Sequence, residues 1–205
     1  MSDMLGNALA EVAGPMKDFW TKLAGSDCTM WLTAFKRFLR KENPWTSKFS
    51  VRWTVTLGIH KTPKAYEQAL ESAGFKIGDW ARDILKKVKC SKEQIEVNLA
   101  SATVAELGFQ KGASTADLYS AILAQGGQLC PAEVGPALRL FLKDQPKNEW
   151  LWIAMEAISV SCGDLGVFSV DHRDAGLWLD SGSGPPVNRW GPGHRVVFVV
   201  PSQVS

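Results

Sequence analysis

The sequence predicts an α+β protein: an antiparallel sheet with a C-terminal strand meander, packed by several helices, and an N-terminal helical extension. Two observations support this prediction. Helical and strand periodicities follow in the order helices, strand, helices, strand, helices, and then a run of strands. The late strands are joined by short turns, which favours antiparallel neighbours. We place the helical extension at residues 1–45 and the α+β domain at residues 46–205.

The composition is that of an ordinary globular protein. The chain has 205 residues, of which 45% are hydrophobic and 21% are charged, and its formal net charge is +2. So small a charge gives no general argument for binding nucleic acid or membranes. The cysteines are far apart, the N-terminus lacks a signal-peptide pattern, and no window approaches the ~18 apolar residues of a membrane span. We therefore expect a cytoplasmic protein with free thiols, no cofactor and no membrane contact.

The first part of the chain combines helices with two strands. Thr62 followed by Pro63 is typical of a helix start, and Gly74 of a helix end. Residues 49–57 alternate between apolar and polar side chains, which predicts a strand with one solvent-facing side. The expected elements are a weak amphipathic segment over 1–15, helices over 16–23 and 28–42, a strand over 49–57, helices over 62–74 and 79–88, a strand over 95–99, and helices over 103–108 and 114–125.

The stretch 129–160 is highly apolar, and we expect the rest of the domain to pack on it. Pro131 suits the first position of a helix, Glu133 can reach back to the open amides, and Pro136 is expected to keep this helix short. Residues 150–158 are mostly apolar on both faces, as in a strand buried on both sides. The remaining predictions are strands over 138–142, 165–170, 177–179 and 195–200, a turn at 144–148, a tight connection over 171–176, a loop over 181–192, and a core that includes Leu151, Trp152, Ile153 and Met155.

One pair of residues suggests nucleophilic catalysis. Cys130 lies at a predicted helix start, where the pKa of a thiol is lowered, and His60 follows a strand and precedes a helix. A Cys130–His60 pair, oriented by Asp144 or Glu156, has the composition of a hydrolase site. The alternative, which we favour, is that Cys130 is a buried core residue, as free cysteines commonly are.

Glu156 stands out because it lies in an apolar stretch that we expect to be buried. A buried carboxylate must find a partner or take up a proton. Glu156 is therefore a candidate general acid or base, although an ion pair with Arg139 is the favoured interpretation. The histidines His172 and His194 lack the spacing of metal-binding motifs, so we expect no metal site.

Two further features suggest binding rather than catalysis. The predicted helix over 28–42 places Lys36, Arg37, Arg40 and Lys41 on one face, which could contact phosphates or could be an ordinary solvated surface. Trp190 lies in the long loop over 181–192 and is a candidate binding residue, since such loops are often functional. Motifs for nucleotide binding or for α/β-hydrolase catalysis are absent from the sequence.

Six segments of the sequence carry a resemblance to known sequences: FLRKENPW (38–45), LGIHKTPKAYEQALESAGFKIGDWARDIL (57–85), SATVAELGFQKGAS (101–114), LCPAEVGPALRLFLKDQP (129–146), EWLWIAMEAI (149–158) and DLGVFSVDH (164–172). In these segments the chain resembles a family of small uncharacterised bacterial proteins. The resemblance covers nearly the whole chain and implies a single module. It implies no activity, cofactor or catalytic residue.

The sequence thus favours a non-catalytic cytoplasmic binding module whose partner is a protein before a nucleic acid. This expectation depends on a well-formed core, abundant tryptophan, and the lack of a catalytic motif. The alternative is a small hydrolase-type enzyme that uses Cys130 and His60.

Overall fold

The computed structural model describes the backbone of residues 2–26, 28–40 and 48–201, with side chains from residue 13 onward. It divides the chain into two compact units, 1–46 and 47–205. In the first unit, α1 (Ser2–Leu23) and α2 (Cys28–Leu39) contact each other, and the rings of Phe19 and Phe35 lie 4.8 Å apart. The predicted division between an amphipathic segment over 1–15 and a helix over 16–23 is wrong, since α1 is one helix that continues through Pro15.

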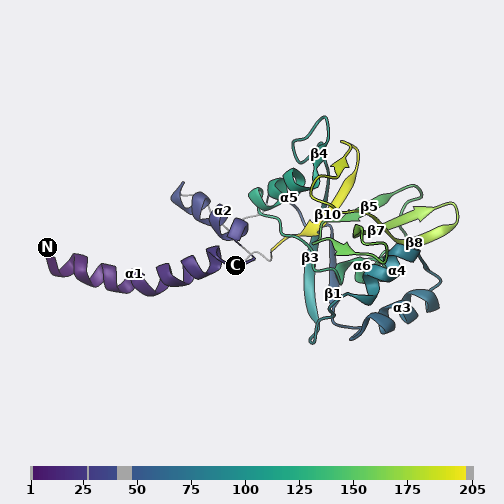
Figure 1. Cartoon of the computed structure of the whole chain (residues 1–205), viewed down its shortest axis with the longest axis horizontal. Coiled ribbons are helices and arrows are strands. Elements are labelled where there is room, and N and C mark those ends of the chain that lie inside the picture. Colours follow the sequence, from purple (N-terminus) through teal and green to yellow (C-terminus); the bar gives the residue numbers. More distant parts are fainter. Residues whose placement is uncertain (1, 27, 41–47, 202–205) are drawn as a thin grey trace. The chain divides into compact units, whose positions relative to one another are not determined.

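The second unit is built on one mixed sheet with the strand order β1-β3-β10-β5-β7-β8-β2 (Figure 1). Most neighbours pair antiparallel, while β10 with β5 and β2 with β8 pair parallel. The strands are β1 (Trp53–Leu57), β2 (Lys76–Ile77), β3 (Ile95–Thr103), β5 (Trp150–Ile153), β6 (Ile158–Ser159), β7 (Leu165–Arg173), β8 (Gly176–Ser183) and β10 (Arg195–Val199), and β4 (Ala113–Ser114) pairs with β9 (Arg189–Trp190) outside this sheet. The predicted α+β fold is confirmed.

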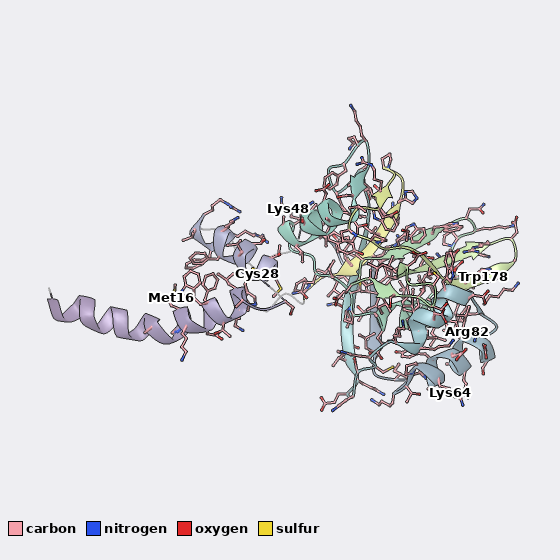
Figure 2. All side chains as sticks on the ribbon, in the orientation of Figure 1. Met16, Cys28, Lys48, Lys64, Arg82 and Trp178 are labelled. Carbon is pink, nitrogen blue, oxygen red and sulfur yellow. The ribbon has the colours of Figure 1, made fainter. Side chains whose placement is uncertain are left out.

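The helices of this unit are α3 (Pro63–Ser72), α4 (Asp79–Lys86), α5 (Thr115–Ala124) and α6 (Val134–Phe141). The helix α6 contacts β1 at one end of the strand order and β7 and β8 near the other end, so the sheet curls around α6. Arg82 of α4 pairs with Glu67 and Glu71 of α3, and Figure 2 labels Arg82 on α4 and Lys64 on α3. In Figure 1, α5 lies beside β4, away from α3 and α4.

The segment 138–142 is helical, so the predicted strand there is wrong. Pro136 occupies the third position of α6, where a backbone N–H has no acceptor within the helix, and the helix therefore continues past it. The alternation of leucines with Arg139 and Phe141 suggested a strand. In the structure, however, Leu138 and Arg139 are both fully buried, because the curled sheet surrounds α6 on several sides.

Two other predicted boundaries are also wrong. The long strand over 150–158 is interrupted: β5 ends at Ile153, Met155 forms an isolated bridge with Cys130, and β6 is short. The predicted loop over 181–192 contributes its first residues to β8 and Arg189–Trp190 to β9. Of the expected core side chains, Leu151, Ile153 and Met155 are buried, whereas Trp152 is half-buried.

Candidate functional site

The first strand of the sheet, β1, has an open edge. It stands at one end of the strand order, and no described segment pairs with its outer side. The N–H of Val200 donates to the carbonyl of Asn98 at 2.8 Å, so the backbone of Asn98 faces β10. Thr54 is opposite Asn98 in the antiparallel ladder, where backbone groups alternate in direction. The N–H and C=O groups of Thr54 and Thr56 are therefore directed outward.

A groove runs along this open edge, between β1 and α6. Its volume is about 280 Å³. Apolar side chains form much of its surface, and two of them, Ile59 and Phe141, are 53% and 51% exposed. The groove is lined by Thr54, Val55, Thr56, Ile59, His60, Tyr66, Ala137, Leu140 and Phe141. Large apolar side chains that are exposed together commonly mark an interaction surface.

A buried carboxylate holds the walls of this groove together. Glu133, just before α6, is 1% exposed and accepts four hydrogen bonds. Its Oε1 accepts from the N–H of Gly58 and the hydroxyl of Tyr66, both at 2.9 Å. Its Oε2 accepts from the N–H and the hydroxyl of Ser91, both at 2.7 Å. These bonds join the end of β1, α3 and the segment before β3 to the start of α6.

The hydrogen bonds also determine the charge of this carboxylate. Burial raises the pKa of Glu133, and the hydrogen bonds from Gly58, Ser91 and Tyr66 lower it. Together the bonds outweigh burial, so the pKa of Glu133 is below its ordinary value. Burial and the neighbouring Glu133 raise the pKa of Tyr66, so Tyr66 stays a hydrogen-bond donor. The ring of His60 packs edge-on against Tyr66 at 4.8 Å and lines the groove.

The combination of an open edge and an adjacent apolar groove suits the addition of an extended peptide strand. In this mode the peptide backbone bonds to the edge strand, and alternate side chains enter the groove. Strand edges are commonly protected by lysine, proline or a bulge. The residues of β1, from Trp53 to Leu57, include no charged residue and no proline.

The structure does not bring the predicted nucleophile pair together. Cys130 is 4% exposed, and its thiol lies 3.6 Å from the carbonyl of Val197. Burial raises the pKa of this thiol, which is opposite to the effect expected at a helix start. Between Cys130 and His60, both in the described part of the chain, there is no hydrogen bond or ring contact.

The predicted ion pair between Glu156 and Arg139 is also absent from the described residues. Glu156 is exposed, because β5 ends before it. Arg139 is fully buried and donates instead to Oε1 of Gln145 at 2.6 Å and to the carbonyl of Leu142. Burial lowers the pKa of Arg139 to about 10, although the nearby Asp171 opposes the shift.

The predicted basic face is not a single solvated surface. Lys36 and Arg40 are exposed, but Arg37 is only 9% exposed, and Lys41 lies outside the described residues. The helix α2 ends at Leu39, before Arg40. A face that loses one of its cations to burial is a weaker phosphate-binding surface than the sequence suggested.

Trp190, the other candidate binding residue, belongs to the interior. It is 5% exposed, and its indole N–H donates to Oγ1 of Thr115 at 2.8 Å. Its ring packs edge-on against Trp152 and His194. Trp190 therefore connects β9 to the start of α5 and does not present a free face.

The described part of the chain contains neither a cluster of metal-ligating side chains nor a membrane-spanning helix. Its histidine, cysteine, aspartate and glutamate side chains form no group of three or more that could hold a metal ion. Nδ1 of His172 is 2.6 Å from the carbonyl of Gln145, and Nδ1 of His194 is 3.2 Å from that of Gly191. None of the described helices is long and apolar enough to cross a membrane.

Comparison with known proteins gives no match to a protein-family model, to a curated protein or to a solved structure. The functional argument therefore depends on the geometry of the groove. Sequence reasoning identified only His60 among the groove residues. The alternating pattern of residues 49–57 predicted a strand but gave no signal that its edge would be open, because an open edge depends on the strand order.

Proposed function

We propose that the protein is a non-catalytic binding module that takes up an extended peptide segment of a partner protein as an additional strand at β1. The observation that carries this proposal is the open edge of Thr54 and Thr56 beside the apolar groove of α6. An edge of this kind recognises a peptide backbone, which neither a folded nucleic acid nor a small metabolite offers. The free thiols of Cys28, Cys90, Cys130 and Cys162 support a reducing compartment, and we include a cytoplasmic location in the proposal.

The groove also defines the side-chain pattern of the partner. Residues of an added strand that lie opposite Val55 face α6, on the side of Leu140 and Phe141. Residues opposite Thr54 and Thr56 face away from it. The partner segment therefore carries apolar side chains at alternate positions. Each backbone hydrogen bond contributes about 0.5–1.5 kcal/mol to binding, and each buried apolar side chain contributes about 1.5–3 kcal/mol. The cost of ordering the peptide offsets a large part of this gain. We expect dissociation constants of about micromolar.

The experiment is a selection of peptides from a random displayed library with the full chain as bait. The best peptide is then measured by fluorescence anisotropy. We expect alternating apolar residues in the selected sequences. We also expect at least about tenfold weaker binding when an amide that faces β1 is N-methylated, since each lost backbone bond costs about 1.4 kcal/mol when its partner is left unpaired.

A proline variant tests the same edge from the side of the protein. Thr56→Pro removes an outward N–H and leaves the ladder between β1 and β3 in place, because proline is tolerated at strand edges. We expect about tenfold or greater loss of affinity with little change in melting temperature. The matched control is Ser183→Pro, on the part of β8 that extends beyond its pairing with β2, which should bind a lysine-free selected peptide as the wild type does. Equal binding by both variants, or peptides without an alternating pattern, would refute the proposal.

A further inference from the structure

A second cavity, separate from the groove, lies where α4 approaches the paired ends of β7 and β8. Its volume is about 300 Å³. The indole of Trp80 contributes to its wall from the start of α4 and is 57% exposed. Asp164, which precedes β7, and Ser181 and Ser183 of β8 provide its polar lining. The cavity therefore combines an exposed aromatic ring with a carboxylate and hydroxyl groups.

One polar atom in this lining lacks a partner. The hydroxyl oxygen of Ser181 is buried and forms no hydrogen bond with any described residue. The backbone of Ser181 is held in place, because Ser181 is paired with Phe168 in the ladder and its N–H donates to Oδ1 of Asp180 at 2.9 Å. A buried hydroxyl without a partner is costly, and such a group next to a cavity points to a missing ligand.

The charge of the lining indicates the sign of that ligand. Asp164 is the single charged residue among those that line the cavity, and it is exposed. The nearest lysines of α4 are held elsewhere. Nζ of Lys86 is 3.2 Å from Oδ1 of Asp83, and Nζ of Lys87, just after the helix, donates to the carbonyl of Ser159 at 2.6 Å. Among the described residues Asp164 forms no salt bridge, and its Oδ2 lies 3.5 Å from the thiol of Cys162, so the carboxylate can pair with a cation that enters the cavity.

We propose that this cavity binds an alkylammonium group. The ammonium lies over the face of Trp80, which is the side chain best suited to a cation–π contact. Asp164 supplies the opposite charge, and the hydroxyl of Ser181, after rotation of its side chain toward the cavity, accepts one N–H of the ammonium. The alkyl part packs on Trp80 and Leu165. The group can belong to a free amine or to a lysine side chain of a partner, because both present the same chemistry.

The test is an NMR titration of the full chain with three probes. These are n-butylammonium as the free amine, Nα-acetyl-lysine amide as the lysine side chain, and 1-butanol as the neutral analogue. We expect saturable shifts of the Trp80 indole N–H and of the Ser181 amide with at least one ammonium probe. We expect no saturable shifts with butanol. The ammonium probe that binds with the lower dissociation constant shows whether the cavity prefers a free amine or a lysine side chain.

Two variants separate binding from folding. Asp164→Asn and Trp80→Ala should each weaken ammonium binding by about threefold, since the first removes the opposite charge and the second removes an exposed ring face. Asp174→Asn, at an exposed turn outside the cavity, should have no effect. Unchanged amide spectra away from the cavity will show that the variants are folded. Equal binding of butanol, shifts confined to other regions, or unchanged affinity in Asp164→Asn would overturn the proposal. The result is independent of peptide binding at β1.

Discussion

Replacement of Glu133 by glutamine should destabilise the domain by about 3–5 kcal/mol at neutral pH. In the wild type, the carboxylate accepts bonds from Gly58, Tyr66 and Ser91 at 2.7–2.9 Å. Bonds to a charged acceptor contribute about 1.5–3 kcal/mol, against about 0.5–1.5 for neutral pairs. In Glu133→Gln, the amide oxygen still accepts from Gly58 and Tyr66, with a loss of about 1 kcal/mol each.

The larger cost arises at Ser91. The amide nitrogen of the variant faces the Ser91 N–H, so two donors oppose each other. The serine hydroxyl can rotate to accept, but the backbone N–H is left without an acceptor, which costs about 1–3 kcal/mol. The measurement is the free energy of unfolding from urea denaturation. The matched control is Glu156→Gln, at an exposed position, which should change this free energy by less than about 0.5 kcal/mol.

The effect should depend on pH in a defined direction. The folded-state pKa of Glu133 is below its ordinary value, because the hydrogen bonds outweigh the effect of burial. The stabilisation is therefore fully present above the unfolded-state pKa of about 4.3, and it is lost as the pH falls through the folded-state pKa. The difference between wild type and Glu133→Gln should shrink in that acidic range. A destabilisation below about 1 kcal/mol at neutral pH, or a difference that does not shrink in acid, would refute this reasoning.

Two further predictions concern the core. Ile153→Ala should lower the free energy of unfolding in urea by about 2–5 kcal/mol, because the side chain of Ile153 is 1% exposed. A change below about 1 kcal/mol would mean that β5 lies at the periphery of the core. The thiol of Cys130 should be alkylated by iodoacetamide far more slowly than that of the exposed Cys162, as measured by peptide mass spectrometry, because burial raises the Cys130 pKa. Comparable rates in the native protein would contradict the buried position of Cys130.

Local sequence signals predicted several element starts. Thr62 caps α3 by accepting from the N–H of Ala65, and Ser114 caps α5 by accepting from the N–H of Asp117. Thr103 and Glu106, in the predicted helix over 103–108, form the reciprocal bonds of a capping box, although they open a turn and not the expected helix. These features depend on residues close in sequence, which is why they could be predicted.

The errors arose where the surroundings decide the structure. Leu138 alternates with Arg139 as in a strand, but the segment is a helix that the sheet encloses on several sides, so both residues are buried. Periodicity cannot distinguish a helix buried all round from a strand. Similarly, the predicted role of Glu133 was to bond the amides at its own helix start. Its actual partners, Gly58, Tyr66 and Ser91, are far away in sequence.

The groove could not be predicted because it depends on strand order. The last strand, β10, inserts between β3 and β5, and no described strand pairs with the outer side of β1. Nothing in the residues of β1 specifies whether a second neighbour will pair with it. His60 was selected for its position between a strand and a helix, and it does line the groove, but beside Tyr66 and not beside Cys130.

Amide hydrogen exchange of β1, resolved by residue, tests the open edge most directly. In the free protein, we predict that the N–H groups of Thr54 and Thr56 exchange faster than that of Val55, because they have no acceptor in β3. Addition of a saturating selected peptide should slow exchange at Thr54 and Thr56 and leave Val55 unchanged. Strong protection of Thr54 and Thr56 without peptide, or bound peptide that leaves their exchange unaltered, would contradict strand addition at β1.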